Sequence, residues 1–228
     1  REGRITASTA VYRILGGGDR MKIVNDIMGY SKSVRQTEAM RWGTDNEPVA
    51  RSEYVSAMEE THTNFTCDIT GLKINAGFPY LGATPDGVIK CSCCPGTGVL
   101  EIKCPYKYQN SFDGADEDKN FCIDFRRHEL PTNHQYYNQI MTQMLVCKAD
   151  YCDLFVWCKT DWILVRLNRD EDRINCIQEN TSAFFEEHLL PELLTRKHDQ
   201  TVDEEQLFCS CKRPSFGKMV PCSGPSCN

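Results

Sequence analysis

Two short stretches of the chain combine acidic and basic side chains in a pattern that could bind a metal ion. Pro85-Asp86-Gly87 offers one carboxylate, and Glu101-Ile102-Lys103 offers a second carboxylate and an ammonium group. Carboxylate oxygens are hard ligands that suit Mg²⁺ or Mn²⁺. With a lysine beside them to orient water or to neutralise charge, such a site can hydrolyse phosphodiester bonds. The two stretches therefore predict metal-dependent phosphodiester chemistry.

The spacing within the second stretch is that of a β-strand. Residues two apart on a strand point to the same face, so Glu101 and Lys103 would project together while Ile102 packs into the core and offers its carbonyl group. A turn at Gly96 would bring Asp86 alongside. The alternative is a solvated strand pair with an ordinary Pro-Asp-Gly turn. The order and separation of the two stretches favour the site.

The elements around these stretches predict an α/β fold with a central mixed, largely antiparallel sheet flanked by helices. Short apolar runs separated by glycine, proline and asparagine predict antiparallel strands between residues 66 and 104. Apolar spacing predicts helices over 6–15, 36–62, 132–146 and 171–196, strands over 151–159 and 162–168, and a second short helix after the glycines at 16–18. We expect Thr6 or Ser8 to cap the first helix. We expect the helix over 36–62 to break near Gly43 and to restart with Pro48 in its first turn. We expect the C-terminal helix, over 171–196, to cover one side of the sheet.

Composition limits the class of protein. With 228 residues, 40% of them hydrophobic, the chain can build a core, and neither a long apolar run nor a leader pattern is present, so we expect no membrane span and no signal peptide. The formal charge of -6 argues against a protein that coats nucleic acid, although a basic groove can coexist with an acidic loop at 113–118. The fourteen cysteines in a chain with this much apolar sequence favour a reducing, intracellular compartment.

Four segments together resemble one nuclease family. Thr84-Pro85-Asp86-Gly87 resembles a Ser-Pro-Asp-Gly motif, and Leu100-Glu101-Ile102-Lys103-Cys104-Pro105 resembles a Leu-Glu-x-Lys-Cys-Pro motif. Both belong to the PD-(D/E)XK nucleases of the lambda exonuclease and YqaJ viral recombinase group. Residues 43–51 resemble the helix that supplies another active-site glutamate, and residues 1–8 resemble the segment that contacts a 5′-phosphate.

The resemblance implies an Mg²⁺-dependent (or Mn²⁺-dependent) deoxyribonuclease, most simply an exonuclease acting on duplex DNA ends in recombination or repair, with a restriction-endonuclease-like core. It implies that the metal ligands are Asp86, Glu101, the carbonyl of Ile102, and Glu47. It implies that a terminal phosphate is held by Arg1, Ser8 and Thr84. The catalytic set would be Lys103, Glu101, Asp86, Glu47 and Gln139.

The choice of Gln139 rests on a repeat as well as on the resemblance. Gln135, Gln139 and Gln143 recur every four residues and would share one helix face, which could also be an exposed polar face. This chain departs from the family at one point: the arginine expected shortly after Lys-Cys-Pro is absent, and the chain reads Tyr106-Lys107-Tyr108-Gln109 there. That departure puts 5′-end preference and processivity in question. The alternatives are a nuclease-derived DNA- or chromatin-binding module that does not cut, and an endonuclease on the same fold.

Two groups of cysteines could bind zinc. Cys91, Cys93 and Cys94 lie in the turn between the two key strands with Cys67 near, but no paired Cys-x-x-Cys knuckles are present, so free thiols are favoured. The C-terminal group resembles the first half of a PHD finger and consists of Cys209, Cys211, Cys222 and Cys227. With half of the finger alone, neither zinc site of that module could be completed, so we expect the segment either to be disordered or to form an improvised four-cysteine site.

The domain organisation follows from these segments. We expect a nuclease domain at 1–197, an acidic linker at 198–208 and a truncated PHD-like segment at 209–228, within a longer parent protein. The PHD resemblance implies Zn²⁺, a nuclear location and histone tails as partners of the complete module. The nuclease resemblance implies DNA as partner and a homotrimer around it.

Overall fold

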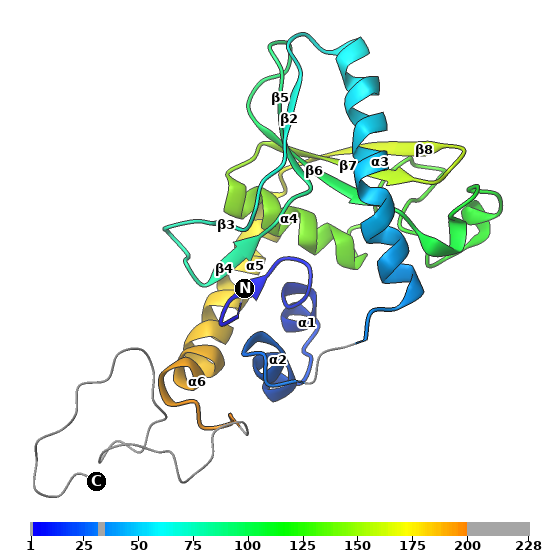
Figure 1. Ribbon diagram of the computed structural model, residues 1–228. Coiled ribbons are helices and arrows are strands. Elements are labelled where there is room, and N and C mark those ends of the chain that lie inside the picture. Colours follow the sequence, from blue (N-terminus) through cyan, green and yellow to red (C-terminus); the bar gives the residue numbers. More distant parts are fainter. Residues whose placement is uncertain (1, 32–34, 200–228) are drawn as a thin grey trace, which may run out of the picture.

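The computed structural model describes residues 2–31 and 35–199. Its centre is a five-stranded sheet with the order β2 (Thr66–Asp68), β5 (Gly87–Lys90), β6 (Gly98–Lys103), β7 (Tyr151–Trp157) and β8 (Trp162–Asn168). Strands β6 and β7 run parallel and the other neighbours run antiparallel (Figure 1). The predicted α/β fold with a mixed, largely antiparallel sheet is confirmed.

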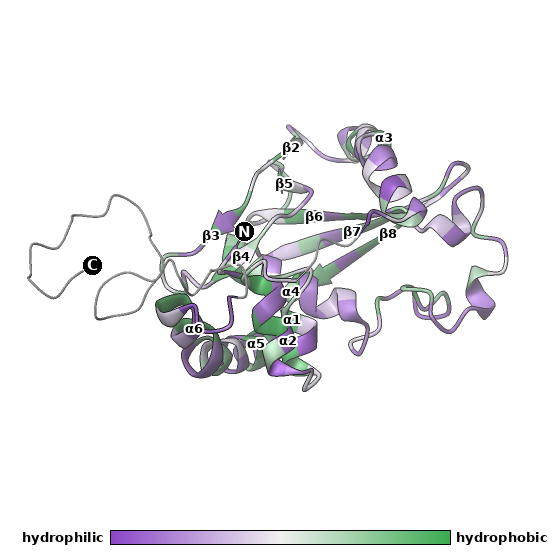
Figure 2. Ribbon diagram, turned by 60° about the horizontal axis from the view of Figure 1, so that its bottom comes forward, coloured by the Kyte–Doolittle hydropathy of each residue, from purple (hydrophilic) through white to green (hydrophobic). Residues whose placement is uncertain are grey.

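Helices cover both faces of this sheet. Leu100 and Ile102 on β6 pack with α3 (Glu38–Thr61), whereas Val99 belongs to the core shared with α4 (Gln135–Cys147) and α5 (Glu171–Phe184). Colouring by hydropathy shows hydrophobic stretches along β6, β7 and β8 between these layers (Figure 2). Because side chains alternate along a strand, Glu101 and Lys103 share the face that Val99 takes, which is the face of α4.

A second, three-stranded sheet was not predicted. It consists of β1 (Ile5–Thr6), which runs parallel to β4 (Leu81–Ala83), and β3 (Lys73–Ile74), which runs antiparallel to it. The predicted single sheet over residues 66–104 is therefore divided between two sheets. Pairing with β4 also takes Thr6 out of the predicted first helix.

The first helix begins later than predicted. Helix α1 (Val11–Leu15) has Ala10 at its N-cap without a side-chain hydrogen bond, so neither Thr6 nor Ser8 caps it. Helix α2 (Arg20–Ile27) follows, with Asp19 accepting a hydrogen bond from the backbone N–H of Lys22 at 3.0 Å. The capping prediction was wrong because the extended pairing of β1 determines the backbone ahead of the helix.

Helix α3 is continuous where a break was predicted near Gly43. Pro48 lies inside the helix, which removes one backbone donor. Packing on either side of the proline holds the helix together: Trp42 stacks on Trp157 with ring centroids 6.3 Å apart, and Tyr54 donates a hydrogen bond to Asp153 at 2.7 Å. Tertiary contacts thus override the local signal.

The C-terminal helical region is divided into three parts. Helix α5 is followed by a π-helical turn (Phe185–Leu189) and by α6 (Leu190–Thr195), which has Pro191 in its first turn. Helix α5 packs on α1 and α4, so it covers the helical layer on one side of the sheet. Two 3-10 helices, Tyr106–Tyr108 and Ala115–Glu117, lie in the segment between β6 and α4. Across the described ranges, no helix combines the length and apolarity needed to cross a membrane.

Candidate active site

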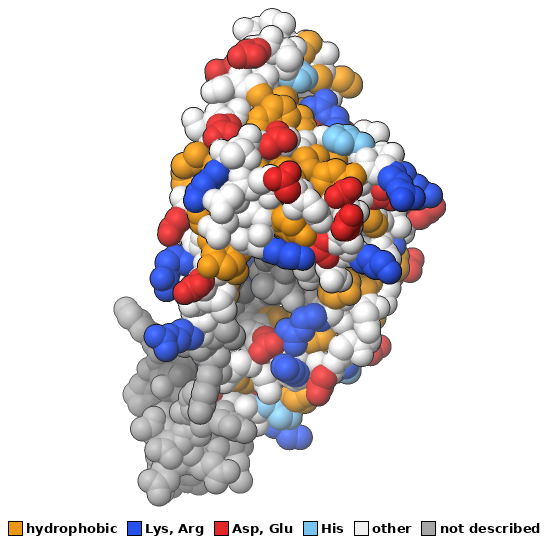
Figure 3. Space-filling model, turned by 90° about the vertical axis from the view of Figure 1, so that its right-hand side faces the viewer, with side chains coloured by type: hydrophobic (Ala, Val, Ile, Leu, Met, Phe, Trp, Pro, Cys, Tyr) orange, Lys and Arg blue, Asp and Glu red, His pale blue; other side chains and the backbone are white. Residues whose placement is uncertain are grey.

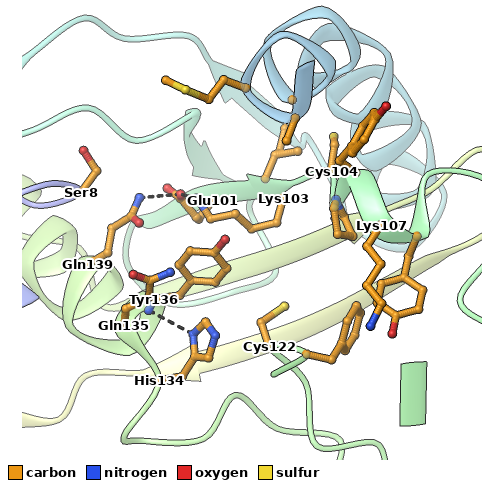
Figure 4. Close-up of a pocket in the computed structure, with 18 of the residues that line it drawn as sticks. Ser8, Glu101, Lys103, Cys104, Lys107, Cys122, His134, Gln135, Tyr136 and Gln139 are labelled. Carbon is orange, nitrogen blue, oxygen red and sulfur yellow. Dashed lines mark hydrogen bonds and ion pairs between the residues drawn. The ribbon is translucent and has the colours of Figure 1, made fainter. Parts of the chain in front are cut away.

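A cleft of about 1060 Å³ lies beside the C-terminal end of β6, between α3, the start of α4 and the 3-10 segment. Glu101, Lys103, Gln139 and Tyr136 lie around the same space in the close-up view (Figure 4). The predicted site residues on its wall are Ser8, Glu47, Asp86, Glu101, Ile102, Lys103 and Gln139. The fold therefore gathers residues from five separate segments of the chain.

Glu101 is the most enclosed of these residues, with 2% of its surface exposed. One carboxylate oxygen accepts a hydrogen bond from the Gln139 side-chain amide at 2.5 Å and pairs with the Lys103 ammonium. The other oxygen accepts a hydrogen bond from Gln143 at 2.6 Å. Because residues four apart share one side of a helix, α4 brings both amides to a single buried carboxylate. These donors fix the orientation of the carboxylate.

Lys103 extends from the same face of β6. Burial alone would lower its pKa, but the charge of Glu101 and the hydrogen bond to it outweigh burial, so the pKa is raised. The ammonium nitrogen also lies 4.5 Å from the centroid of the Tyr136 ring, which is a favourable position for a cation. Lys103 is therefore held as a positive charge on the wall of the cleft.

Asp86 directly precedes β5, and one of its carboxylate oxygens accepts a hydrogen bond from the backbone N–H of Ile102 at 2.6 Å. Burial and the nearby charge of Glu101 raise the pKa of Asp86 to about 8, with a smaller contribution from Glu47. The raised pKa shows that the positive charge of Lys103 does not offset burial and the repulsion between the neighbouring carboxylates at Asp86. The donors are hard oxygens, so they fit a divalent cation such as Mg²⁺ or Mn²⁺.

Glu47 reaches the cleft from α3, where it forms an ion pair with Arg51 one turn later. The Arg51 side chain also donates a hydrogen bond to the backbone carbonyl of Asp86 at 3.0 Å. Arg51 thus joins the helix that carries Glu47 to the turn that carries Asp86. No role was predicted for Arg51, because its contact with Asp86 crosses 35 residues of sequence.

The remaining predicted residues have different positions. Ser8 is exposed and lines the cleft, whereas Thr84 is half-buried between β4 and β5 and is not on the cleft wall. Lys107 lines the cleft, and its ammonium pairs with Asp118 at 2.6 Å. Five predicted residues lie outside the described part of the chain: Arg1, Cys209, Cys211, Cys222 and Cys227.

Besides Arg51, three contributors to the site were not predicted. Gln143 had a visible signal, since it belongs to the four-residue glutamine repeat, but Gln139 was chosen alone. Tyr136 and His134 line the cleft at the start of α4, and no pattern in the sequence marked them. Their positions depend on how α4 approaches β6.

The fold and the carboxylate–lysine cleft define a protein of the lambda-exonuclease-like fold class. Residues 1–150 match the YqaJ-like viral recombinase domain, so the chain belongs to that family. The suspected family is thereby confirmed.

Similar solved structures support the fold. An alkaline exonuclease from Laribacter hongkongensis (LHK-Exo) has 24% sequence identity and a TM-score of 0.62, over 89% of this chain and 96% of that chain. The same exonuclease has also been solved in complex with dAMP. A phage-related exonuclease from Haemophilus somnus 129PT has 13% identity and a TM-score of 0.56, over 85% of this chain and 96% of that chain.

Two curated proteins match shorter parts of the chain. Protein R354 of Acanthamoeba polyphaga mimivirus is 33% identical over 99 residues, which is 40% of this chain and 16% of R354. The chromatin modification-related protein YNG2 of Candida glabrata is 44% identical over 36 residues, which is 16% of this chain and 13% of YNG2. The chain thus spans less than a fifth of the length of either relative.

Proposed function

We propose that the chain is an Mg²⁺-dependent (or Mn²⁺-dependent) DNA exonuclease that acts on duplex ends in recombination or repair. The observation that carries this proposal is the buried Glu101 carboxylate, held by Gln139, Gln143 and Lys103 beside Asp86 in one cleft. Membership of the YqaJ-like family supports it. So do the names of the solved structures, which describe exonucleases with this fold.

In the proposed mechanism the cation would be held by Asp86, Glu101, Glu47 and the carbonyl of Ile102. When bound, the cation supplies a Lewis acid for the phosphoryl group and activates water. Lys103 orients the attacking water or neutralises the charge that develops on the phosphate. Gln139 and Gln143 keep the Glu101 carboxylate in place, so that it needs little rearrangement during the reaction.

The proposed site for the terminal phosphate is at the Ser8 edge of the cleft, with Arg1 and Thr84 as further contributors. Lys107 stands near the position where the family has an arginine, and its charge is shared with Asp118. We expect preference for a 5′-phosphate to be weak while that ion pair persists. Comparing degradation rates of 5′-phosphorylated and 5′-hydroxyl ends, for the wild type and for Ser8→Ala, tests this part of the proposal.

The alternative function is a DNA- or chromatin-binding module that does not cut. The distribution of charge bears on this choice: one face of the molecule shows acidic and basic side chains interspersed, with no broad basic area among the residues described there (Figure 3). Binding by charge alone needs concentrated lysine and arginine. The enzyme is therefore favoured, since Glu47, Asp86, Glu101 and Lys103 are all present in one cleft.

The substrate experiment compares linear duplex DNA with covalently closed circular DNA, each incubated with Mg²⁺, Mn²⁺ or a chelator. An exonuclease releases mononucleotides from the linear DNA only, and only with metal. Cutting of the circular DNA would replace the proposal by an endonuclease. Retained binding without any cutting of either DNA would favour the binding module.

Larger assemblies are part of the proposal. We propose that three copies encircle duplex DNA, that the protein acts in the nucleus, and that a PHD-like module with bound Zn²⁺ recognises histone tails. The chromatin-related name of YNG2 supports the last point. Light scattering after gel filtration gives the number of copies, and a single-chain mass would contradict the trimer.

A further inference from the structure

Four metal-ligating side chains meet at the end of the β5–β6 hairpin, away from the cleft. They are His62, Cys91, Cys93 and Cys94, and their ligand atoms all lie within 4.8 Å of one another. His62 is the C-cap residue of α3, and Cys91 directly follows β5. Since Asp86 directly precedes β5, this cluster and the carboxylate cleft lie at opposite ends of that strand.

Four of the six distances within the cluster are close to those of a tetrahedron, and the other two are no longer than 4.8 Å. The His62 Nδ1 atom lies 3.3 Å from Cys93 Sγ, 3.5 Å from Cys94 Sγ and 3.6 Å from Cys91 Sγ. The Sγ atoms of Cys93 and Cys91 are 3.5 Å apart. Tetrahedral Zn²⁺, with Zn–S of about 2.3 Å and Zn–N of about 2.0–2.1 Å, gives edges of about 3.6 Å between N and S and about 3.8 Å between two sulfurs.

The backbone and the neighbouring charges also suit a bound cation. The turn is tied to the end of α3, because Ser92 donates its backbone N–H to the carbonyl of Thr63 at 2.8 Å. The guanidinium of Arg166 lies 3.7 Å from Cys94 Sγ and is itself held by Asp153. Three thiolates and one Zn²⁺ leave a single negative charge, and the Arg166 guanidinium, which also pairs with Asp153, lies beside it.

We propose that His62, Cys91, Cys93 and Cys94 form a structural Zn²⁺ site. Soft thiolates with one imidazole favour zinc, and four protein ligands leave no open position, which is typical of structural sites. The ion would connect the end of α3 to the hairpin. It would thereby fix together the helix that carries Glu47 and the strands that carry the other acidic residues of the cleft.

The fourth ligand differs from the one considered from the sequence. Cys67 is on β2, paired with Ile89, and its sulfur lies close to Gly87, where an added Cβ would be only 2.6 Å away. It therefore points toward the start of β5, away from the cluster at the other end of that strand, and the structure places His62 at the cluster instead. His62 was not predicted as a ligand because it precedes the cysteines by 29 residues or more in the sequence.

The test must separate this site from the C-terminal cysteines. We therefore use the full chain with Cys209, Cys211, Cys222 and Cys227 all replaced by serine, expressed and purified under reducing conditions. Metal content is measured by mass spectrometry after gel filtration, and Co²⁺ uptake is followed by absorption spectroscopy. We expect about one zinc ion per chain and the absorption bands of tetrahedral cobalt bound to thiolates.

In that background, Cys93→Ser should lose the zinc and the cobalt bands, whereas the matched change Cys176→Ser, outside the cluster, should keep both. If Cys93→Ser does not fold, Cys93→His serves instead: it should retain metal with weaker thiolate absorption. A folded, reduced background protein without zinc or cobalt uptake would overturn the proposal. So would full zinc content in Cys93→Ser, or a disulfide among these cysteines in the freshly purified protein.

Discussion

Glu101 combines two properties that are costly together, since it is a carboxylate and it is almost fully buried. The structure offsets that cost with the amides of Gln139 and Gln143 and with the ammonium of Lys103. Each donor occupies one direction around the carboxylate. These donors fix the position of the carboxylate, as the proposed role of Glu101 as a metal ligand requires, and the contribution of each donor can be measured by removing it.

Gln143 is the donor that serves Glu101 without lining the cleft, so it should act as a positioning residue. Gln143→Met keeps the volume and removes the hydrogen bond, and we expect it to lower the free energy of unfolding by about 2 kcal/mol, because the bond is to a charged group. We also expect weaker metal binding, seen as a higher Mg²⁺ concentration for half-maximal cleavage. The control is Gln36→Met on the exposed surface. Equal stability and equal Mg²⁺ response in both variants would contradict this role.

Among individual residues, the sequence predicted best those site residues that lie close together along the chain. Glu101 and Lys103 are two apart on one strand, and Asp86 lies in a distinctive turn, so both motifs could be recognised directly. Arg51 and Tyr136 could not be, because their roles depend on the approach of α3 and α4 to the sheet. A repeat such as that of the glutamines shows a shared face but not which of its members meets the carboxylate.

Helix α4 delivers the glutamines, and its start is held by His134. The His134 ring nitrogen Nδ1 accepts a hydrogen bond from the backbone N–H of Tyr136 at 3.2 Å. Burial, together with the charge of Lys103, lowers the pKa of His134 below its ordinary 6.5. The capping interaction requires the neutral ring, so protonation would both bury a charge and remove the cap.

This arrangement predicts a pH dependence of stability. As the pH falls through about 6.5, the unfolded chain takes up a proton at His134 while the folded protein resists it, so stability falls until the folded pKa is passed. His134→Ser keeps an N-cap acceptor and does not titrate. As the pH falls from about 8 to about 5, the melting temperature of the wild type should therefore fall more steeply than that of His134→Ser, so that the two values converge or cross. Parallel curves for the wild type and His134→Ser would contradict the prediction; His188→Ser is the control.

Elements were predicted best where their pattern was long. Strands β7 and β8 and helix α4 begin and end within a few residues of the predicted bounds. The two-residue strand β1 has no pattern of its own and exists because β4 offers it a parallel partner. The predicted break in α3 was wrong because tertiary contacts again decide the structure: Trp42 and Tyr54 anchor the helix on both sides of Pro48.

Across the whole molecule, the sheet separates two hydrophobic clusters, and the cleft needs both helical layers in place. One buried polar contact ties α3 to the sheet: Asp153 is fully buried and accepts hydrogen bonds from Tyr54 at 2.7 Å and from Arg166 at 2.7 and 2.8 Å. A buried charge with this set of partners is sensitive to the loss of any one.

Tyr54→Phe removes only the hydroxyl from that contact. We expect the free energy of unfolding to fall by about 2 kcal/mol, because a hydrogen bond to a buried carboxylate is lost. Urea unfolding of the wild type and the variant measures the difference. The matched change Tyr12→Phe, on a side chain with 47% of its surface exposed, should alter stability by less than about 0.5 kcal/mol. Equal effects of the two substitutions would show that the Asp153 contact does not hold α3 in place.

In the proposed function, one cleft hydrolyses DNA with a divalent cation, Glu101 and Lys103. The most direct measurement is the rate of nucleotide release from linear duplex DNA, with and without Mg²⁺, for Glu101→Gln and Lys103→Met against the exposed controls Glu60→Gln and Lys22→Met. We predict that nucleotide release depends on Mg²⁺ and that each cleft variant reduces its rate at least about a hundredfold while DNA binding and folding persist. Both control variants should keep the wild-type rate. Release that is independent of metal, or that survives in either cleft variant at the wild-type rate, would contradict the assignment.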